Sequence, residues 1–483
     1  MDRPAPLPLD TWWFRLAVLT ATALAARAVT FGSPVVHVDE TFYLTVAQAM
    51  THGALPYVDL WDRKPIGLFL LYLPAAVWGL PAALYVYQAM AMAAAVATAV
   101  LITRLADRAG WRAGALPAAM LYILWLDLAD GQGGQSPIFY NLPMAGAALL
   151  ALQGSRGRAM AAMLLVGLAL QIKYSVLFEG VGLGLWLLAS DLRSGRRVGE
   201  TIVYALMLGT IALLPTALAM AAYAMLGHLD AFIFANFVSI LHRSKDSPAL
   251  MIDRAGEAAA ILSLLLFAIA GWRAKAEPLV RLFLHLWLLV ALVAFVGFGG
   301  WYNHYTLPVM LPGAVCAAAF FQRRARSWWW IVVPLALLFV TGQVVLRSER
   351  ERRGTAAQFQ RLTATVGRGP GGLFVYSGPV LLYPATGRPA LTRYLFPSHL
   401  QFDREAGSIG VDQRAEIERI FAQAPAAVVM APAIGEEEPA MRTLVEQRLS
   451  RDGYVAQPSV RLGHDDVVVF RRPTSSPSRP AAR

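Results

Sequence analysis

Cysteine and charged residues are both scarce in this chain of 483 residues: it has a single cysteine, and only 15% of its residues are charged. The lone Cys316 excludes an intramolecular disulfide and a zinc site built from several cysteines. Soluble domains carry about 25% charged residues, so the low charge excludes an ordinary soluble enzyme and a disordered chain. Hydrophobic residues, in contrast, make up 57% of the sequence, which indicates an integral membrane protein.

The hydrophobic residues are gathered in runs separated by short arginine-rich links. The first run, residues 12–31, contains Ala23-Leu24-Ala25, which resembles a signal-peptidase site, but it is interpreted as an uncleaved first helix. Several runs are shorter than the roughly 20 residues that span a bilayer, so the bounds of the helices are approximate. In total the runs predict about eleven membrane helices. The other ten are expected near residues 82–104, 113–127, 139–153, 157–172, 175–190, 199–226, 256–272, 280–299, 304–321 and 327–346.

The positive charge is distributed unevenly between alternate links. The formal net charge of +11 would suggest nucleic-acid binding in a soluble protein, but here the positive-inside rule explains it and no nucleic-acid partner is expected. One set of alternate loops carries only 6 Lys or Arg in total, so these loops are placed outside the membrane, together with the C-terminal region. The five links placed inside carry 14 Lys or Arg, at residues 104–112, 156–158, 193–197, 273–281 and 323–326.

The C-terminal quarter of the chain has a different character. Residues 347–361 are polar and charged, and short β-branched runs at 372–377, 426–430 and 466–470 predict strands. Helical spacing of apolar residues at 412–423 and 439–450 places two helices between the strands. The predicted fold class is thus a polytopic all-α membrane region with a small α/β domain outside the membrane. The predicted parts are residues 1–346, residues 347–472 and a disordered Pro- and Ser-rich tail at 473–483.

The first outer loop, residues 32–65, begins with two adjacent carboxylates, Asp39 and Glu40. Carboxylates at the point where a helix leaves the bilayer are costly to desolvate, so they need a partner or a function. One alternative is structural, with Asp39 capping a helix over 40–52 and Glu40 in its first turn. The two interpretations are compatible, and both are kept open.

The same loop ends with two cations, Arg63 and Lys64, followed by Pro65. Such cations can meet lipid headgroups in general or hold one lipid phosphate. Group transfer from a phosphate-linked donor needs two kinds of side chain. A carboxylate takes a proton from the nucleophile, and cations opposite it stabilise the departing phosphate. The loop is therefore the candidate active site.

These residues form motifs that resemble a known family. Asp39-Glu40-Thr41-x-Tyr43, then Gly-x-Leu-Pro-Tyr at 53–57 and acid–x–Lys-Pro at 62–65, resemble the membrane-embedded GT-C glycosyltransferases. The likeness is to the branch with protein O-mannosyltransferases and the lipid A aminoarabinose transferase. Residues 301–308, Trp-Tyr-Asn-His-Tyr-Thr-Leu-Pro, give a third match. The resemblance covers about residues 1–346, and the α/β domain is placed like the periplasmic domain of those proteins.

The resemblance implies a polyprenyl-phosphate-linked sugar donor and sugar transfer, with inversion, at the periplasmic face of a bacterial inner membrane. The acceptor would be lipid A, a polysaccharide, another lipid or a protein. Asp39 matches the catalytic base, which Glu40 would support. The residues expected to bind the donor phosphate or substrate are Tyr43, Arg63, Lys64, Lys173, Tyr302, His304 and Tyr305.

One departure from the family concerns a second acidic residue, which relatives often carry before the fourth helix. Residues 131–141 contain no acid, although Asp127 and Asp130 lie just upstream. A divalent cation, which some relatives bind, is consequently left open, with Asp39 and Glu40 as its ligands if one is held. No other cofactor is expected.

Two further features have structural explanations beside functional ones, and two more have structural explanations alone. Lys173, between two apolar runs, can snorkel to the interface or meet the donor phosphate. The loop 227–257 can cover the acceptor site or meet anionic headgroups through its basic residues. His285 is expected to be a packing residue, and Trp328–Trp330 an interfacial aromatic belt.

Other functions fit the sequence less well than a transferase does. A transporter or flippase for lipid-linked saccharides should show ionisable residues at mid-membrane and two related halves with broken helices, and neither feature is found. A polysaccharide ligase would carry its key residues in a large late loop, whereas the motifs here begin in the first loop. A non-catalytic scaffold would not need the intact acidic pair.

Overall fold

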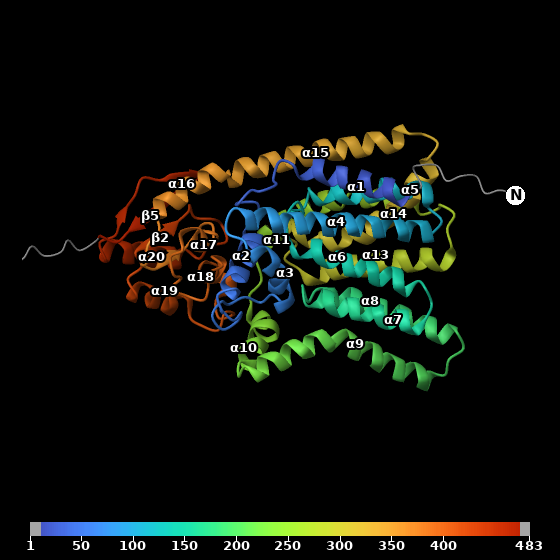
Figure 1. Ribbon diagram of the computed structural model, residues 1–483, viewed down its shortest axis with the longest axis horizontal. Coiled ribbons are helices and arrows are strands. Elements are labelled where there is room, and N and C mark those ends of the chain that lie inside the picture. The colour runs from blue at the N-terminus through green and yellow to red at the C-terminus, as the bar shows by residue number, and fades with distance from the viewer. Residues whose placement is uncertain (1–10, 474–483) are drawn as a thin grey trace, which may run out of the picture.

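The computed structural model describes residues 11–473 as an elongated helical bundle with a small α/β domain at one end (Figure 1). The predicted tail lies almost wholly outside the described residues. The helices of the bundle begin and end near the predicted hydrophobic runs. They are α1 (Trp12–Arg27), α4 (Ala82–Arg108), α5 (Arg112–Leu126), α6 (Ser136–Ala151), α7 (Arg156–Leu170), α8 (Val176–Arg193), α9 (Val198–Met225), α11 (Pro248–Leu262), α12 (Leu265–Gly271), α13 (Pro278–Phe298), α14 (Leu307–Arg324) and α15 (Trp329–Arg353).

The bundle has the length and surface of a multi-pass membrane region. Within the described residues, five helices are long and apolar enough to span a bilayer, and six if α11 and α12, bent by 47°, form one span. Large apolar side chains such as Val203 and Leu206 on α9 are about two-thirds exposed (67% and 68%), as expected where lipid rather than water is the solvent. Shorter helices complete the bundle, so the total of eleven spans stays a prediction.

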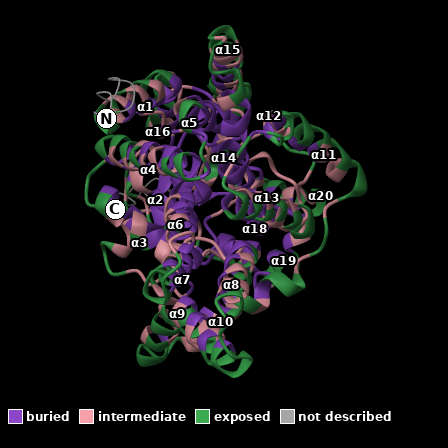
Figure 2. Cartoon of the chain, turned by 90° about the vertical axis from the view of Figure 1, so that its right-hand side faces the viewer, coloured by how far each residue is buried: buried purple, intermediate pink, exposed green. Residues whose placement is uncertain are grey.

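Helix α14 lies at the centre of the bundle, because small residues let its neighbours approach closely. A Cβ atom on Gly114 of α5 would lie 2.0 Å from the carbonyl oxygen of Ala318, so only glycine fits there. Gly313 likewise packs against the ring of Trp125. Close contact between helix backbones compensates for the absence of a hydrophobic driving force within lipid. Figure 2 shows the resulting buried centre and exposed rim.

The connections at the end that carries the α/β domain contain additional short helices. They are α2 (Val38–Met50), α3 (Ile66–Ala76), α10 (Leu229–Ile233), the π-helical turn Phe234–Val238, and the 3₁₀ turns Ser239–His242 and Asn303–Tyr305. Helix α3 was not expected from the sequence. The predicted Asp39 cap was wrong: α2 is capped by His37, whose Nδ1 accepts a hydrogen bond from the Asp39 backbone N–H (3.2 Å). The Asp39 carboxylate is thus not used to cap the helix.

The C-terminal domain is a five-stranded mixed sheet with helices around it. The strands lie in the order β1-β2-β5-β3, with β4 also paired to β5; β1 and β2 are parallel, and the other pairs are antiparallel. The register pairs Leu373 with Ala427 and Val428 with Phe470. The elements are α16 (Ala356–Val366), β1 (Leu373–Val375), α17 (Leu382–Thr386), α18 (Ser398–Gln401), the 3₁₀ turn Asp403–Glu405, α19 (Gln413–Ala422), β2 (Ala427–Met430), α20 (Pro439–Arg451), β3 (Val455–Ala456), β4 (Val460–Leu462) and β5 (Asp465–Arg471).

Trp61 and helix α15 both connect this domain to the bundle. Trp61 is buried, donates its backbone N–H to the Arg393 carbonyl (2.9 Å) and packs edge-on against the His399 ring, with centroids 4.8 Å apart. Helix α15 runs without a break to Arg353, beyond the expected boundary at residue 346. The domain therefore sits directly over the connections that carry the sequence motifs.

Candidate functional site

A cavity of about 910 Å³ lies between the end of the bundle and the C-terminal domain. The bundle connections form its floor and walls, and the domain contributes its roof through the segment 396–405. Of the residues predicted from the sequence, every one except Glu40 lines this cavity: Asp39, Tyr43, Arg63, Lys64, Lys173, Tyr302, His304 and Tyr305. Segments separated by more than 260 residues are thus brought to one space.

Asp39 presents its carboxylate to the cavity from the first turn of α2. Its Oδ2 accepts a hydrogen bond from Gln135 Nε2 (3.2 Å) and lies 3.8 Å from His37 Nδ1. Burial alone would raise the pKa of this carboxyl, but His37, Lys64, His304 and the Gln135 amide outweigh it and hold the pKa well below its ordinary value. Asp39 is therefore ionised at neutral pH.

Glu40, the next residue, lies in a different environment. It is fully buried behind the cavity wall, and its carboxyl packs against Gly133, where an added Cβ would lie 2.1 Å from Glu40 Oε2. Burial raises the pKa of Glu40 to about 8, so it is mostly protonated at neutral pH. The two carboxyls consequently do not face the cavity as a pair, and Glu40 lies within its wall.

Lys64 and Lys173 bring two ammonium groups to the cavity. The Lys64 ammonium lies 3.9 Å from Asp62 Oδ1, and although burial lowers its pKa, Asp62 and Asp39 raise it above the ordinary value overall. Lys173, in the turn between α7 and α8, lies over the Tyr305 ring at 4.5 Å from its centroid. Burial, and then repulsion by Lys64, lower the pKa of Lys173 to about 7. A bound anion would favour the charged form of both lysines.

Arg63 lines the cavity but its guanidinium also pairs with the C-terminal domain, and its role in donor binding stays a prediction. Its guanidinium donates to Glu405 Oε2 (2.6 Å), Ser408 Oγ (2.6 Å) and Ser239 Oγ (3.0 Å). Arg243 pairs with the other oxygen of Glu405 at 3.0 Å. Burial would raise the pKa of Glu405, but the two arginines lower it to about 2. Arg63 thus fixes the first loop to the roof of the cavity.

The opposite wall is the segment Tyr302–Tyr305. The Tyr302 ring lies between two guanidinium groups, 3.8 Å from that of Arg254 and 5.4 Å from that of Arg404, and Arg404 also donates to its hydroxyl. Asp246 forms ion pairs with both arginines, with Arg254 at 2.8 Å and with Arg404 at 2.7 Å. The loop 227–257 is therefore tied to the roof, and its Arg243 and Arg254 are paired with protein acids.

Asp130, one of the two acids just upstream of residues 131–141, faces the cavity. It adopts a left-handed backbone conformation (φ 57°), lines the cavity and accepts a hydrogen bond from Arg353 (2.7 Å). Arg353, with His37 and His304, lowers the pKa of Asp130 to about 2 despite burial. Asp127, the other candidate, is buried outside the cavity lining. The sequence analysis did not identify Gln135 and Arg353 as site residues. The available signals were that Gln135 is an amide in a glycine-rich loop and that Arg353 is an arginine at the end of a helix.

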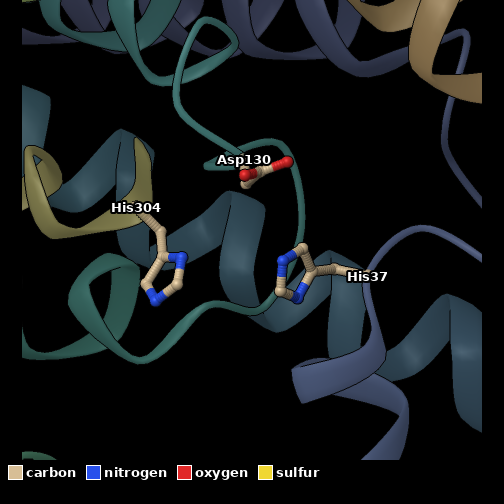
Figure 3. Close-up of side chains that lie close together, drawn as sticks. All are labelled: His37, Asp130 and His304. Atoms are coloured by element: carbon tan, nitrogen blue, oxygen red, sulfur yellow. The ribbon is translucent and has the colours of Figure 1, made fainter. Parts of the chain in front are cut away.

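The residues that could hold a metal ion differ from the expected pair. Asp39 faces the cavity whereas Glu40 is buried against Gly133, and a metal held by this pair stays a prediction. Instead, His37, Asp130 and His304 have potential ligand atoms that lie within 4.8 Å of one another (Figure 3). No ligand set that joins Asp39 to Glu40 is found among the described residues.

An apolar recess leads away from the cavity along α8 and α13. A small pocket shares Lys173 and Tyr305 with the main cavity and reaches Glu179 of α8, which accepts a hydrogen bond from Trp287 Nε1 (2.7 Å). Glu179 also borders a second pocket of about 280 Å³. That pocket is lined by apolar side chains of α6, α8 and α13, among them Met144, Leu183, Trp186, Leu286, Trp287 and Val290.

Comparison with solved structures shows the same architecture in ArnT from Cupriavidus metallidurans. Its crystal structure bound to undecaprenyl phosphate is 14% identical, with a TM-score of 0.59, and the match covers 95% of this chain and 98% of that chain. The apo structure is also 14% identical, with a TM-score of 0.60 and coverage of 94% and 97%. No protein-family model and no curated protein matches the sequence. The chain is thus similar in fold, over nearly its whole length, to ArnT, a GT-C membrane glycosyltransferase, as its motifs predicted.

Proposed function

We propose that the chain is a membrane glycosyltransferase that moves a sugar from a polyprenyl-phosphate-linked donor to an acceptor of the cell envelope. The observation that carries this proposal is that one cavity holds an ionised carboxylate, Asp39, together with the ammonium groups of Lys64 and Lys173. A base for the acceptor and cations for a phosphate are the two requirements of the transfer.

The recess beside Lys173 supports a lipid-linked donor. A phosphate held by Lys64 and Lys173 would lie where the polar cavity meets the apolar pocket between α8 and α13, so an attached isoprenoid chain could continue along that pocket into the bilayer. ArnT, which has the same fold, has been crystallised with undecaprenyl phosphate. The links that follow α4 and α8, whose last turns carry Arg108 and Arg193, lie at the end of the bundle opposite the α/β domain (Figure 1), which supports a periplasmic site by the positive-inside rule.

The chemistry follows from the two sides of the cavity. An acceptor hydroxyl attacks the anomeric carbon, its proton passes to Asp39, and the bond from that carbon to the phosphate oxygen breaks, with inversion. Asp39 is a weak base because its pKa is low, but the hydroxyl becomes acidic as its oxygen bonds to the sugar, so a weak base suffices late in the step. Lys64 and Lys173 stabilise the negative charge left on the polyprenyl phosphate.

The binding half of the proposal is tested with undecaprenyl phosphate itself. We expect the purified chain in detergent to bind this lipid, and Lys64→Gln to weaken binding by about tenfold or more through loss of a charge-assisted contact. The matched control is Arg323→Gln, a partly exposed cation at the opposite end of α14. Equal affinity in the native chain and Lys64→Gln would overturn the assignment of Lys64.

The transfer half is tested in cells. Envelope lipids, polysaccharides and glycoproteins are compared by mass spectrometry in a strain without the gene and in strains restored with the native chain or with Asp39→Asn at equal expression. We expect a sugar-sized mass difference that only the native chain restores, which also identifies the acceptor. Full restoration by Asp39→Asn would contradict transfer chemistry at Asp39 and favour transport of a lipid-linked saccharide.

A further inference from the structure

The charges that line the large cavity are not balanced. Of the described residues in its lining, nine are acids and six are lysine or arginine. Two of these six cations, Lys64 and Lys173, are assigned above to the donor phosphate. The part of the cavity that is left for the acceptor therefore has only four arginines to set against the acids, and the state of those arginines decides which acceptor fits.

Every arginine of the lining is held by an acid of the protein. Arg254 and Arg404 each pair with Asp246 and Glu436, at distances between 2.7 and 3.0 Å. Both arginine side chains are about nine-tenths buried. The other two arginines pair with Glu405, as described above. Breaking a buried ion pair is strongly destabilising, so these arginines are not free to leave their acids for a phosphate of the acceptor.

Helix α11 brings unpaired carboxylates to the same cavity. Asp253 and Glu257 both line it and are exposed, and because they are four residues apart they lie on one face of the helix. Within the described part of the chain, neither side chain forms an ion pair or a hydrogen bond. An acceptor that enters beside α11 therefore meets negative charge that no ion pair offsets.

The roof adds a polar side chain that is neutral and unused. His399 lines the cavity, is only 3% exposed, and its Nδ1 has no hydrogen-bond partner within residues 11–473. Burial is the main cause that lowers the pKa of His399 to about 4, so the ring carries no charge at neutral pH. A buried nitrogen without a partner costs free energy, and a turn of the ring toward the cavity lets a ligand hydroxyl supply the missing hydrogen bond.

We propose that the reacting end of the acceptor is an uncharged, hydroxyl-rich sugar unit that carries no phosphate. An ionised carboxylate only accepts hydrogen bonds, so Asp253 and Glu257 suit the hydroxyl groups of a sugar, and their charge strengthens such bonds. The same charge repels a phosphorylated unit and so provides specificity against it. The inference rests on the proposed transfer, for which it names the class of acceptor.

The test compares two probes that differ only in phosphate: bisphosphorylated lipid A and the same molecule after complete dephosphorylation. The full chain, in a detergent without sugar headgroups, is first saturated with undecaprenyl phosphate, which is proposed to bind at Lys64 and Lys173. We expect the dephosphorylated probe to bind at least about fivefold more tightly, and the difference to shrink at high salt. Equal or tighter binding of the phosphorylated probe would overturn the proposal.

Variants trace the preference to α11. Asp253→Asn combined with Glu257→Gln should reduce the preference at least about threefold, with a native melting temperature because both positions are exposed. The matched control is Asp230→Asn, an exposed acid of the same 227–257 loop that lies outside the cavity lining. A double variant that keeps the full native preference would overturn the role of these two acids in selecting the acceptor.

A second measurement separates this inference from the proposed function. In the cellular comparison, the molecule that gains the sugar is fragmented, and we expect the new sugar on a phosphate-free sugar unit, in the glycolipid or the polysaccharide fraction. A new sugar on a phosphate or on a protein would overturn the inference and leave the transferase standing. If nothing gains a sugar or undecaprenyl phosphate does not bind, the proposed function fails, and the probe comparison in a chain with Lys64→Gln and Lys173→Gln still decides the charge preference of the cavity.

Discussion

Asp39 and Glu40 are consecutive residues in the first turn of α2, yet only Asp39 reaches the cavity, while Glu40 is buried against Gly133. Successive positions on a helix point about 100° apart, so one helical step separates the ionised carboxylate from the protonated one. A functional difference between the two acids follows from this geometry.

The two acids should respond differently to the same chemical change. Asp39→Asn removes the proposed base and should lower transfer about 10²–10⁴-fold, with undecaprenyl phosphate binding retained. Glu40→Gln replaces a mostly neutral acid with a neutral amide of similar shape and should keep most of the activity. Product mass spectrometry at equal expression measures both. Inactive Glu40→Gln with a normal melting temperature would show that the Glu40 carboxyl has a chemical role.

Lys173 should make lipid-phosphate binding sensitive to pH. Its pKa is lowered to about 7 by burial and Lys64, so the free protein loses this charge as pH rises from 6 to 8, and affinity for undecaprenyl phosphate should fall. The phosphate itself gains charge over this range, which acts in the opposite direction. Lys173→Arg keeps its charge throughout, so the difference between the two pH profiles isolates the lysine. Identical profiles would contradict its contact with the phosphate.

Acid should loosen the roof of the cavity through Glu405. The pKa of this carboxyl is about 2 in the folded protein, because of Arg63 and Arg243, against an ordinary value of 4.5. Because the folded value is the lower one, its stabilisation is complete above pH 4.5 and is lost as pH falls toward 2. Hydrogen exchange in residues 396–411 should therefore increase, relative to the rest of the domain, between pH 5 and 3.

A variant pair checks the cause of that loosening. Glu405→Gln cannot ionise, so the same segment should exchange faster already at pH 6, with little further change in acid. Glu446→Gln, at an exposed position of α20, should behave like the native chain. If Glu405→Gln keeps native protection at pH 6, the ion pairs with Arg63 and Arg243 do not hold the roof.

Gly133 should tolerate no side chain. An added Cβ would lie 2.1 Å from Glu40 Oε2, so Gly133→Ala forces the wall apart and should cost about 1–3 kcal/mol. Gly157→Ala, where no atom lies within 4 Å of the added Cβ, is the matched control and should be neutral or slightly stabilising. Thermal unfolding in detergent compares the two. Equal melting temperatures would show that the Glu40 side chain moves freely.

The sequence predicted most elements of the fold, because their signals are local. Hydrophobic runs marked the bundle helices, and β-branched runs marked β1, β2 and β5, since each pattern reflects burial within one element. The Asp39 cap was wrong for a local reason too. Histidine is an unusual N-cap, and nothing in the sequence favoured His37 over an aspartate in the position where caps are common.

The parts of the site that could not be predicted depend on contacts between distant residues. Arg63 and Lys64 are equivalent cations in the sequence, but Arg63 pairs with Glu405, 342 residues away. The ion pair of Arg404 with Asp246 likewise joins the C-terminal domain to the 227–257 loop. Such pairing is set by how the domain docks, and spacing along the chain carries no signal of it.

The unbroken helix α15 has a consequence for how the protein can be divided. Its last residue, Arg353, donates to the Val36 carbonyl and to Asp130, and the Arg352 carbonyl accepts from the His464 backbone N–H (3.0 Å). The C-terminal end of α15 therefore contacts both the loop before Asp39 and the β4–β5 turn. A chain cut at residue 346 would remove the end of α15 and, with it, the contacts that fix the bundle to the domain, so the two parts cannot be separated at the boundary that composition suggests.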